Sequence, residues 1–125
     1  MAHILVIDDE RELRGVVVRF LEAEGHGVRE ASNGREGLEM FRTAPADLVI
    51  TDIIMPEQEG VETIMELHWD FPDVPVIAMS GGNVGGTDFL QVARRLGARQ
   101  TLAKPFGRIE LLKAVREVLS EADPA

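Results

Sequence analysis

The stretch that decides the fold reads Asp47-Leu48-Val49-Ile50-Thr51-Asp52-Ile53-Ile54-Met55-Pro56. Its apolar and β-branched run has no polar alternation, which is typical of a strand buried on both faces, as in a parallel sheet. Pro56 ends the regular structure, so Asp52 is expected at the carboxyl end of a buried strand. Open α/β sheets place their ligand crevices at that end. Taken alone, an aspartate there is more often a turn former or a helix cap than a reactive group.

Four further apolar runs are typical of strands, and they lie at residues 3–7, 28–31, 75–80 and 99–103. A segment with the apolar spacing of a helix follows each strand, including the last. In the first of these segments the apolar positions are Leu13, Val16, Val17, Phe20 and Leu21. Five βα units in succession predict a doubly wound α/β fold, with a five-stranded parallel sheet, right-handed crossovers and helices on both faces.

Composition narrows the classes of protein that remain. A chain of 125 residues predicts one domain over residues 1–125, with a core of about residues 3–120 and a frayed tail at residues 121–125. The net charge of −9 argues against nucleic acid or an anionic membrane as a direct partner. The absence of cysteine excludes disulfides, thiolate zinc sites and cysteine nucleophiles. With no membrane-length apolar run and no signal-peptide pattern, a cytoplasmic protein is the simplest expectation.

Reactive side chains follow four of the five predicted strands, and they are Asp8 and Asp9, Asp52, Ser80 and Lys104. Because the carboxyl ends of parallel strands share one edge of a sheet, these groups are expected to converge. Three converging carboxylates repel one another unless they hold a proton or bind a hard cation such as Mg²⁺. One carboxylate can also attack a phosphoryl group, with the hydroxyl and the ammonium stabilising the charge that develops. The set is complete for metal-assisted phosphoryl transfer to an aspartate.

Each of these residues also has a plainer interpretation. Asp8 and Asp9 can cap the following helix, and Asp9 with Glu12 has the spacing of a capping box. Lys104 by itself is typical of a solvated surface lysine. Residues 81–86 contain four glycines in six positions, but they lack the Gly-Lys-Ser/Thr ending of a phosphate-binding loop.

Taken together and in order, five short elements resemble the receiver domain of the response-regulator family, the phosphorylatable partner in two-component signalling. These elements are residues 6–10, residues 47–52, Met55-Pro56 with Gly60, residues 78–81, and Lys104-Pro105-Phe106. The resemblance covers about residues 3–120. It implies a flavodoxin-like fold shared with chemotaxis regulators. It also implies a signalling switch that is not an enzyme, apart from at most self-dephosphorylation.

The resemblance implies a role for each acid at the sheet edge. Asp52 would accept a phosphoryl group from the phosphohistidine of a sensor histidine kinase or a histidine phosphotransfer protein. Asp9 and Asp52 would ligate Mg²⁺ directly, Asp8 would do so through water, and the backbone carbonyl of Ile54 would be a further ligand.

The resemblance also implies how the signal leaves the site. Ser80 would bond a phosphoryl oxygen, and Lys104 would pair with Asp52 and then with the phosphate, next to a cis bond before Pro105. The change would pass through Ser80 and the glycine-rich loop of residues 81–86 to the face formed by residues 87–119. That face would contact a downstream protein or form a homodimer. Thr101 departs from the family, which usually has an aromatic residue there, so the usual aromatic coupling is not expected.

Two alternatives remain open at this point. The first is a pseudo-receiver that folds and binds partners but is not phosphorylated. The second is a Mg²⁺-dependent phosphatase with an aspartyl-phosphate intermediate. Phosphatases of this kind typically need an acid two residues after the nucleophile, and Ile54 occupies that position.

Overall fold

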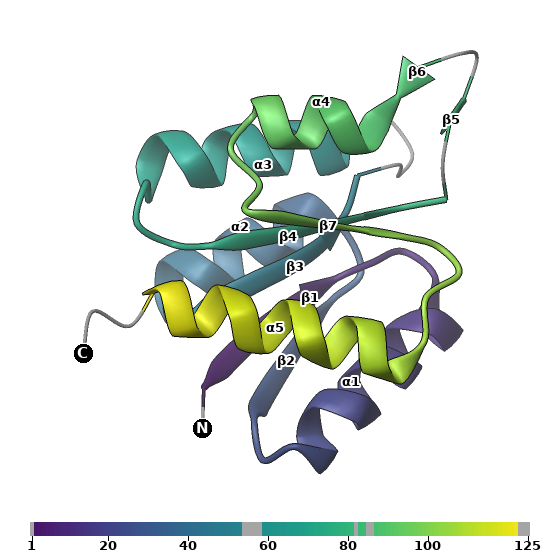
Figure 1. The fold of residues 1–125 in the computed structure, drawn as a ribbon. Coiled ribbons are helices and arrows are strands. Elements are labelled where there is room, and N and C mark those ends of the chain that lie inside the picture. The colour runs from purple at the N-terminus through teal and green to yellow at the C-terminus, as the bar shows by residue number, and fades with distance from the viewer. Residues whose placement is uncertain (1, 54–58, 82, 85–86, 123–125) are drawn as a thin grey trace.

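A five-stranded parallel sheet forms the centre of the molecule (Figure 1). The computed structural model describes residues 2–53, 59–81, 83–84 and 87–122. The strands are β1 (His3–Ile7), β2 (Gly27–Ala31), β3 (Leu48–Asp52), β4 (Val76–Ser80) and β7 (Gln100–Ala103), in the order β2-β1-β3-β4-β7. Neighbouring strands are parallel throughout. The predicted doubly wound α/β fold is confirmed.

Helices cover both faces of this sheet (Figure 1). One face packs against α1 (Arg11–Ala23) and α5 (Arg108–Ala122), and the other against α2 (Gly34–Thr43), α3 (Glu59–Asp70) and α4 (Phe89–Arg95). Successive residues of a strand point into different cores. In β3, for example, Leu48 and Ile50 pack on the α1/α5 side while Val49 packs on the α2/α3/α4 side. Because helices exclude solvent from both faces of the sheet, the central strands require an unbroken apolar run.

The segment predicted as a loop at residues 81–86 contains secondary structure of its own. β5 (Asn83–Val84) pairs antiparallel with β6 (Thr87–Asp88) in a two-stranded ladder apart from the main sheet. Strands of two residues are too short to show a period-two pattern, so periodicity cannot predict them. Asp88 then caps α4, because its Oδ1 accepts hydrogen bonds from the backbone N–H groups of Leu90 and Gln91.

The predicted capping box at the start of α1 is wrong. The N-cap is Glu10 rather than Asp9, and its side chain makes no capping hydrogen bond. Asp8 stabilises this turn instead, because its Oδ1 accepts a hydrogen bond of 2.9 Å from the backbone N–H of Glu10. The turn after β1 is therefore one residue longer than the capping-box spacing assumed.

Arg29 of β2 contributes to stability by bonding the carboxyl end of α2. Its guanidinium donates to the backbone oxygen of Met40, in the last turn of α2, and to that of Ala44, the C-cap residue. Arg29→Ala is expected to lower the free energy of unfolding by about 1–2 kcal/mol, since hydrogen bonds from charged donors are among the stronger ones. Urea unfolding measures this, with Arg19→Ala on the exposed side of α1 as the control. Equal losses in the two variants would show that the carbonyl bonds contribute nothing.

Candidate functional site

The carboxyl edge of the sheet brings the predicted reactive residues together. Asp8 follows β1, Asp52 ends β3, Ser80 ends β4 and Lys104 follows β7. Backbone hydrogen bonds continue beyond the strands at this edge. The N–H of Lys104 donates to the oxygen of Ser80 at 2.7 Å, and that of Ile53 donates to the oxygen of Met79 at 3.0 Å. These bonds determine the direction in which each side chain leaves the sheet.

Lys104 is the centre of the site. Its Nζ lies 2.9 Å from Asp52 Oδ2, 3.5 Å from Asp8 Oδ2 and 3.6 Å from Glu10 Oε1. Burial lowers the pKa of Lys104, but the hydrogen bond and the charge of Asp52 outweigh it, so the pKa is raised overall. The ammonium therefore stays charged at neutral pH. The Lys104–Pro105 peptide bond is cis, as the family resemblance implied.

The two aspartates beside Lys104 are almost completely removed from solvent. Asp8 is 0% exposed and Asp52 is 3% exposed. Burial raises the pKa of Asp8 to about 6 from 3.8, although the hydrogen bond from the Glu10 N–H and the charge of Lys104 act in the opposite direction. At pH 7 the Asp8 carboxylate is therefore mostly ionised although burial disfavours its charge, and a bound cation would offset that cost.

Among the described residues, three acids are arranged so that they could hold a metal ion. Oxygens of Asp8, Glu10 and Asp52 lie within 4.8 Å of one another. This donor set fits a hard cation such as Mg²⁺, which takes oxygen ligands and retains several waters. Glu10 was not among the predicted ligands. The structure brings it into the group because the N-cap position of α1 directs its side chain toward Lys104.

The described part of the structure does not place the other two predicted ligands, Asp9 and Ile54, in this group of acids. Asp9 is exposed and does not belong to the three-acid group in the described part of the chain. Direct metal ligation by Asp9 stays a prediction. Ile54, whose carbonyl is the fourth predicted ligand, lies outside the described residues.

Ser80 and Thr101 occupy the strands on the α4 side of the site. Ser80 is completely buried and stands in register with Ala103, one residue before Lys104. Thr101, at the position where the family usually has an aromatic residue, accepts a 3.1 Å hydrogen bond from Arg94 Nη2. This bond links α4 to β7, so these two elements are joined by a polar contact.

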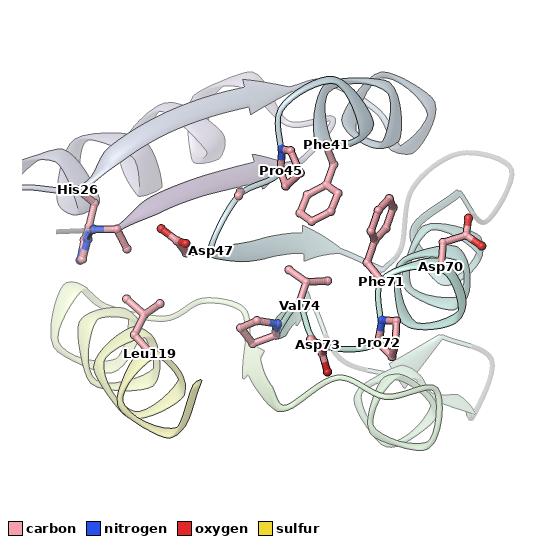
Figure 2. Close-up of a pocket in the computed structure, with 13 residues that line it drawn as sticks. His26, Phe41, Pro45, Asp47, Asp70, Phe71, Pro72, Asp73, Val74 and Leu119 are labelled. Carbon is pink, nitrogen blue, oxygen red and sulfur yellow. Dashed lines mark hydrogen bonds between the residues drawn. The ribbon is translucent and has the colours of Figure 1, made fainter. Parts of the chain in front are cut away.

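A separate hollow of about 820 Å³ lies at the opposite, amino-terminal edge of the sheet (Figure 2). Phe41 and Phe71 meet edge-on there with ring centroids 4.7 Å apart. Two of its acids already have partners, since Asp47 accepts from the backbone N–H of His3 and Asp70 pairs with Arg42. It contains none of the predicted site residues, so the chemistry belongs to the carboxyl edge.

Comparison with known proteins agrees with this geometry. The family model of the response regulator receiver domain matches residues 4–116. The chain belongs to this family. Receiver domains of response regulators are signalling domains of two-component systems rather than classical enzymes.

Relatives of this receiver domain occur as parts of longer proteins. It is 36% identical to the DNA-binding transcriptional regulator NtrC of Azospirillum brasilense, over 98% of this chain and 25% of that protein. It is 32% identical to response regulator MprA of Mycolicibacterium vanbaalenii, over 97% of this chain and 52% of that protein. The chain thus spans about half, or less, of these curated relatives.

Solved structures resemble the receiver domain along nearly its whole length. A CheY-like receiver domain protein from Methanospirillum hungatei superposes with a TM-score of 0.88 at 28% identity, covering 98% of this chain and 96% of that one. The receiver domain of NtrX from Brucella abortus gives a TM-score of 0.86 at 30% identity, covering 94% and 98%. In the described part of the chain, no helix has the length and apolar character needed to cross a membrane.

Proposed function

We propose that this receiver domain is a phosphorylation-controlled switch, and that Asp52 is the phosphoacceptor. The observation that carries the proposal is the ion-pair centre at the sheet edge, where Lys104 bonds the buried Asp52 at 2.9 Å with Asp8 and Glu10 close by. A carboxylate held beside an ammonium and further acids is suited to receive a phosphoryl group and a hard cation together. The donor in this proposal is the phosphohistidine of a sensor histidine kinase or a histidine phosphotransfer protein.

The proposed reaction is a displacement at phosphorus. A carboxylate oxygen of Asp52 attacks, the bond between phosphorus and the donor's imidazole nitrogen breaks, and the imidazole leaves with the bonding electrons. The product is an acyl phosphate on Asp52. Lys104 stabilises the charge on the phosphoryl oxygens, and Ser80 donates its hydroxyl to one of them.

Carboxylates at the same edge would hold the cation. We assign it to Asp9 and Asp52 directly, to Asp8 through water and to the carbonyl of Ile54, with Glu10 close to the same space. When bound, Mg²⁺ supplies positive charge that further stabilises the transferring phosphoryl group. The raised pKa of Asp8 supports this assignment, because a cation offsets the cost of an ionised carboxylate that is buried.

We further propose that phosphorylation is read on the face formed by residues 87–119. Ser80 directly precedes residues 81–86, and the β5–β6 ladder leads from there to the capped start of α4. The Arg94–Thr101 hydrogen bond then connects α4 with β7. The face has basic residues in an otherwise acidic protein, which suits an acidic downstream protein or a second copy. These residues are Arg94, Arg95, Arg99 and Arg108.

Phosphorylation of Asp52 can be tested directly by intact-mass spectrometry after incubation with acetyl phosphate and Mg²⁺. Wild type is expected to gain one phosphoryl group, and Asp52→Asn is expected to gain none, because the nucleophile is removed. Asp47→Asn, an identical substitution at the opposite edge of the sheet, is the matched control and should behave as wild type. Wild type that remains unmodified both here and with a panel of phosphorylated histidine kinases would favour the pseudo-receiver.

A further inference from the structure

Arg14 of α1 is bonded to the same turn that presents the acids. Its Nη1 donates a 2.7 Å hydrogen bond to the backbone oxygen of Asp8, and its Nε donates a 3.0 Å bond to Oε1 of Glu30 in β2. The Arg14 side chain is only 14% exposed. Its own backbone N–H also donates to the oxygen of Glu10 at 2.9 Å. One residue thus contacts both ends of the turn formed by residues 8–10.

These contacts restrain a particular part of the backbone. The Asp8 oxygen belongs to the peptide unit that joins Asp8 to Asp9, so the Arg14 bond restrains the rotation of that unit. The Asp8 carboxylate is held separately, by the Glu10 N–H at 2.9 Å and by Lys104 Nζ at 3.5 Å. If the Arg14 side chain is removed, the Asp8 N–H keeps its bond to the Ala31 oxygen and the Asp8 carboxylate keeps its two partners, but the Asp8 oxygen loses its bond to Arg14. The peptide between Asp8 and Asp9 is then less restrained.

We propose that Arg14 is a positioning residue for the cation site, acting through the Asp8–Asp9 peptide and bridged to Glu30. It touches no predicted ligand oxygen, because it bonds a backbone oxygen on the α1 side of the turn. The assignment of the cation as Mg²⁺ rests on the proposed function. The restraint on the turn is a property of the metal-free protein.

Charge and geometry predict opposite effects of removing this arginine. Arg14 is a cation near a cation site, so Coulomb repulsion alone predicts that Arg14→Ala tightens Mg²⁺ binding. If Arg14 positions the ligands, the same substitution weakens binding. Groups that orient metal ligands typically account for a 10- to 100-fold change in affinity. We expect Arg14→Ala to weaken Mg²⁺ binding about tenfold.

Arg14→Lys separates the two effects further. It keeps the positive charge but has one nitrogen in place of the two that bond Asp8 and Glu30. Its Mg²⁺ affinity is expected between those of wild type and Arg14→Ala. Glu30→Gln keeps an oxygen acceptor for Nε, so the orienting contact remains and its Mg²⁺ affinity is expected to stay within about threefold of that of wild type.

The experiment is calorimetric titration with MgCl₂ of wild type, Arg14→Ala, Arg14→Lys, Glu30→Gln and Asp52→Asn. Arg19→Ala is the matched control, because it removes the same charge from the same helix at an exposed position. Amide hydrogen exchange of Asp9 and Glu10 in the metal-free proteins provides a second readout. Exchange there is expected to accelerate in Arg14→Ala and to be unchanged in Arg19→Ala.

The possible results are distinct. Unchanged or tighter Mg²⁺ binding in Arg14→Ala, with unchanged exchange at Asp9, would overturn the positioning role and leave the proposed function intact. Wild type that shows no Mg²⁺ site sensitive to Asp52→Asn would instead contradict the cation assignment in the proposed function. If Arg14→Ala does not fold, the intermediate affinity of Arg14→Lys decides the question, because equality with wild type would refute the proposal.

Discussion

Asp8→Asn is expected to raise the free energy of unfolding of the metal-free protein by about 2 kcal/mol at pH 7. Asp8 is completely buried, and its pKa is raised to about 6 from 3.8. A shift of one pKa unit corresponds to about 1.4 kcal/mol, so holding this group ionised destabilises the fold by roughly 3 kcal/mol at pH 7. Asparagine keeps an oxygen that can accept from the Glu10 N–H and removes the charge. It gives up the ion pair with Lys104, which reduces the gain.

The difference in stability between Asp8→Asn and wild type is expected to depend on pH. The folded protein keeps the Asp8 proton up to about pH 6, whereas the unfolded chain releases it near 3.8. The stabilising contribution of the protonated carboxyl is therefore fully present below pH 3.8 and is lost as the pH rises through 6. The difference between the variant and wild type should accordingly be small near pH 4 and reach its full value by pH 7.

Urea unfolding in EDTA between pH 4.5 and 7.5 measures this difference, with Asp47→Asn as the control at the other edge of the sheet. Saturating Mg²⁺ should then stabilise wild type more than Asp8→Asn, because binding to the native state adds to stability. A variant less stable than wild type at pH 7 in EDTA, or a difference independent of pH, would contradict the explanation. Burial of the ionised Asp8 carboxylate would then not be a cost to stability that a bound cation offsets.

Gly60→Ala is expected to lower the free energy of unfolding by about 3 kcal/mol and to abolish phosphorylation. A Cβ at Gly60 would lie within 3.0 Å of the backbone oxygen of Asp52 and of backbone carbons of Ile53. Backbone atoms at the end of a buried strand cannot yield as a flexible side chain can. Relief of the clash therefore requires α3 or the end of β3 to move, and overpacking of this kind costs about 1–3 kcal/mol or more.

Gly15→Ala is the matched control for this prediction. Gly15 lies inside α1, and a Cβ there would meet nothing within 4 Å. The substitution should therefore stabilise the protein by about 0.5–1 kcal/mol, because alanine favours helices over glycine. Thermal unfolding gives the stabilities, and intact-mass spectrometry with acetyl phosphate gives the phosphorylation. If Gly60→Ala behaved like Gly15→Ala, close packing of α3 against the phosphoacceptor strand would be excluded as the reason for glycine.

The main sheet was predictable from residues because its signals are local. The apolar runs before Asp8, Asp52 and Ser80 have the pattern of strands that are buried on both sides. Once five βα units are counted, the parallel arrangement follows from the alternation of strands and helices, and the crossovers are right-handed. The gathering of Asp8, Asp52 and Lys104 then follows too, because the carboxyl ends of all the parallel strands share one edge of the sheet.

Finer features were not predictable, because they depend on the direction of a turn rather than on its position. Three consecutive acids end the first strand, and composition does not distinguish them. The N-cap at Glu10 directs that side chain to Lys104 and leaves Asp9 exposed. Arg14 showed no sign of a role, since an arginine in an amphipathic helix is ordinary. Its proposed role depends on the distance between its Nη1 and the backbone oxygen of Asp8.

The sequence by itself determined the sheet, its connectivity and the edge where the reactive groups gather, because burial patterns and strand ends are properties of short segments. Only the tertiary structure decided which acids share the space around Lys104, that Gly60 packs against the backbone of Asp52, and that Arg14 restrains the Asp8–Asp9 peptide. Each of these depends on distances of about 3 Å between atoms from different elements. Such distances are set when helices and strands pack, and no local pattern records them.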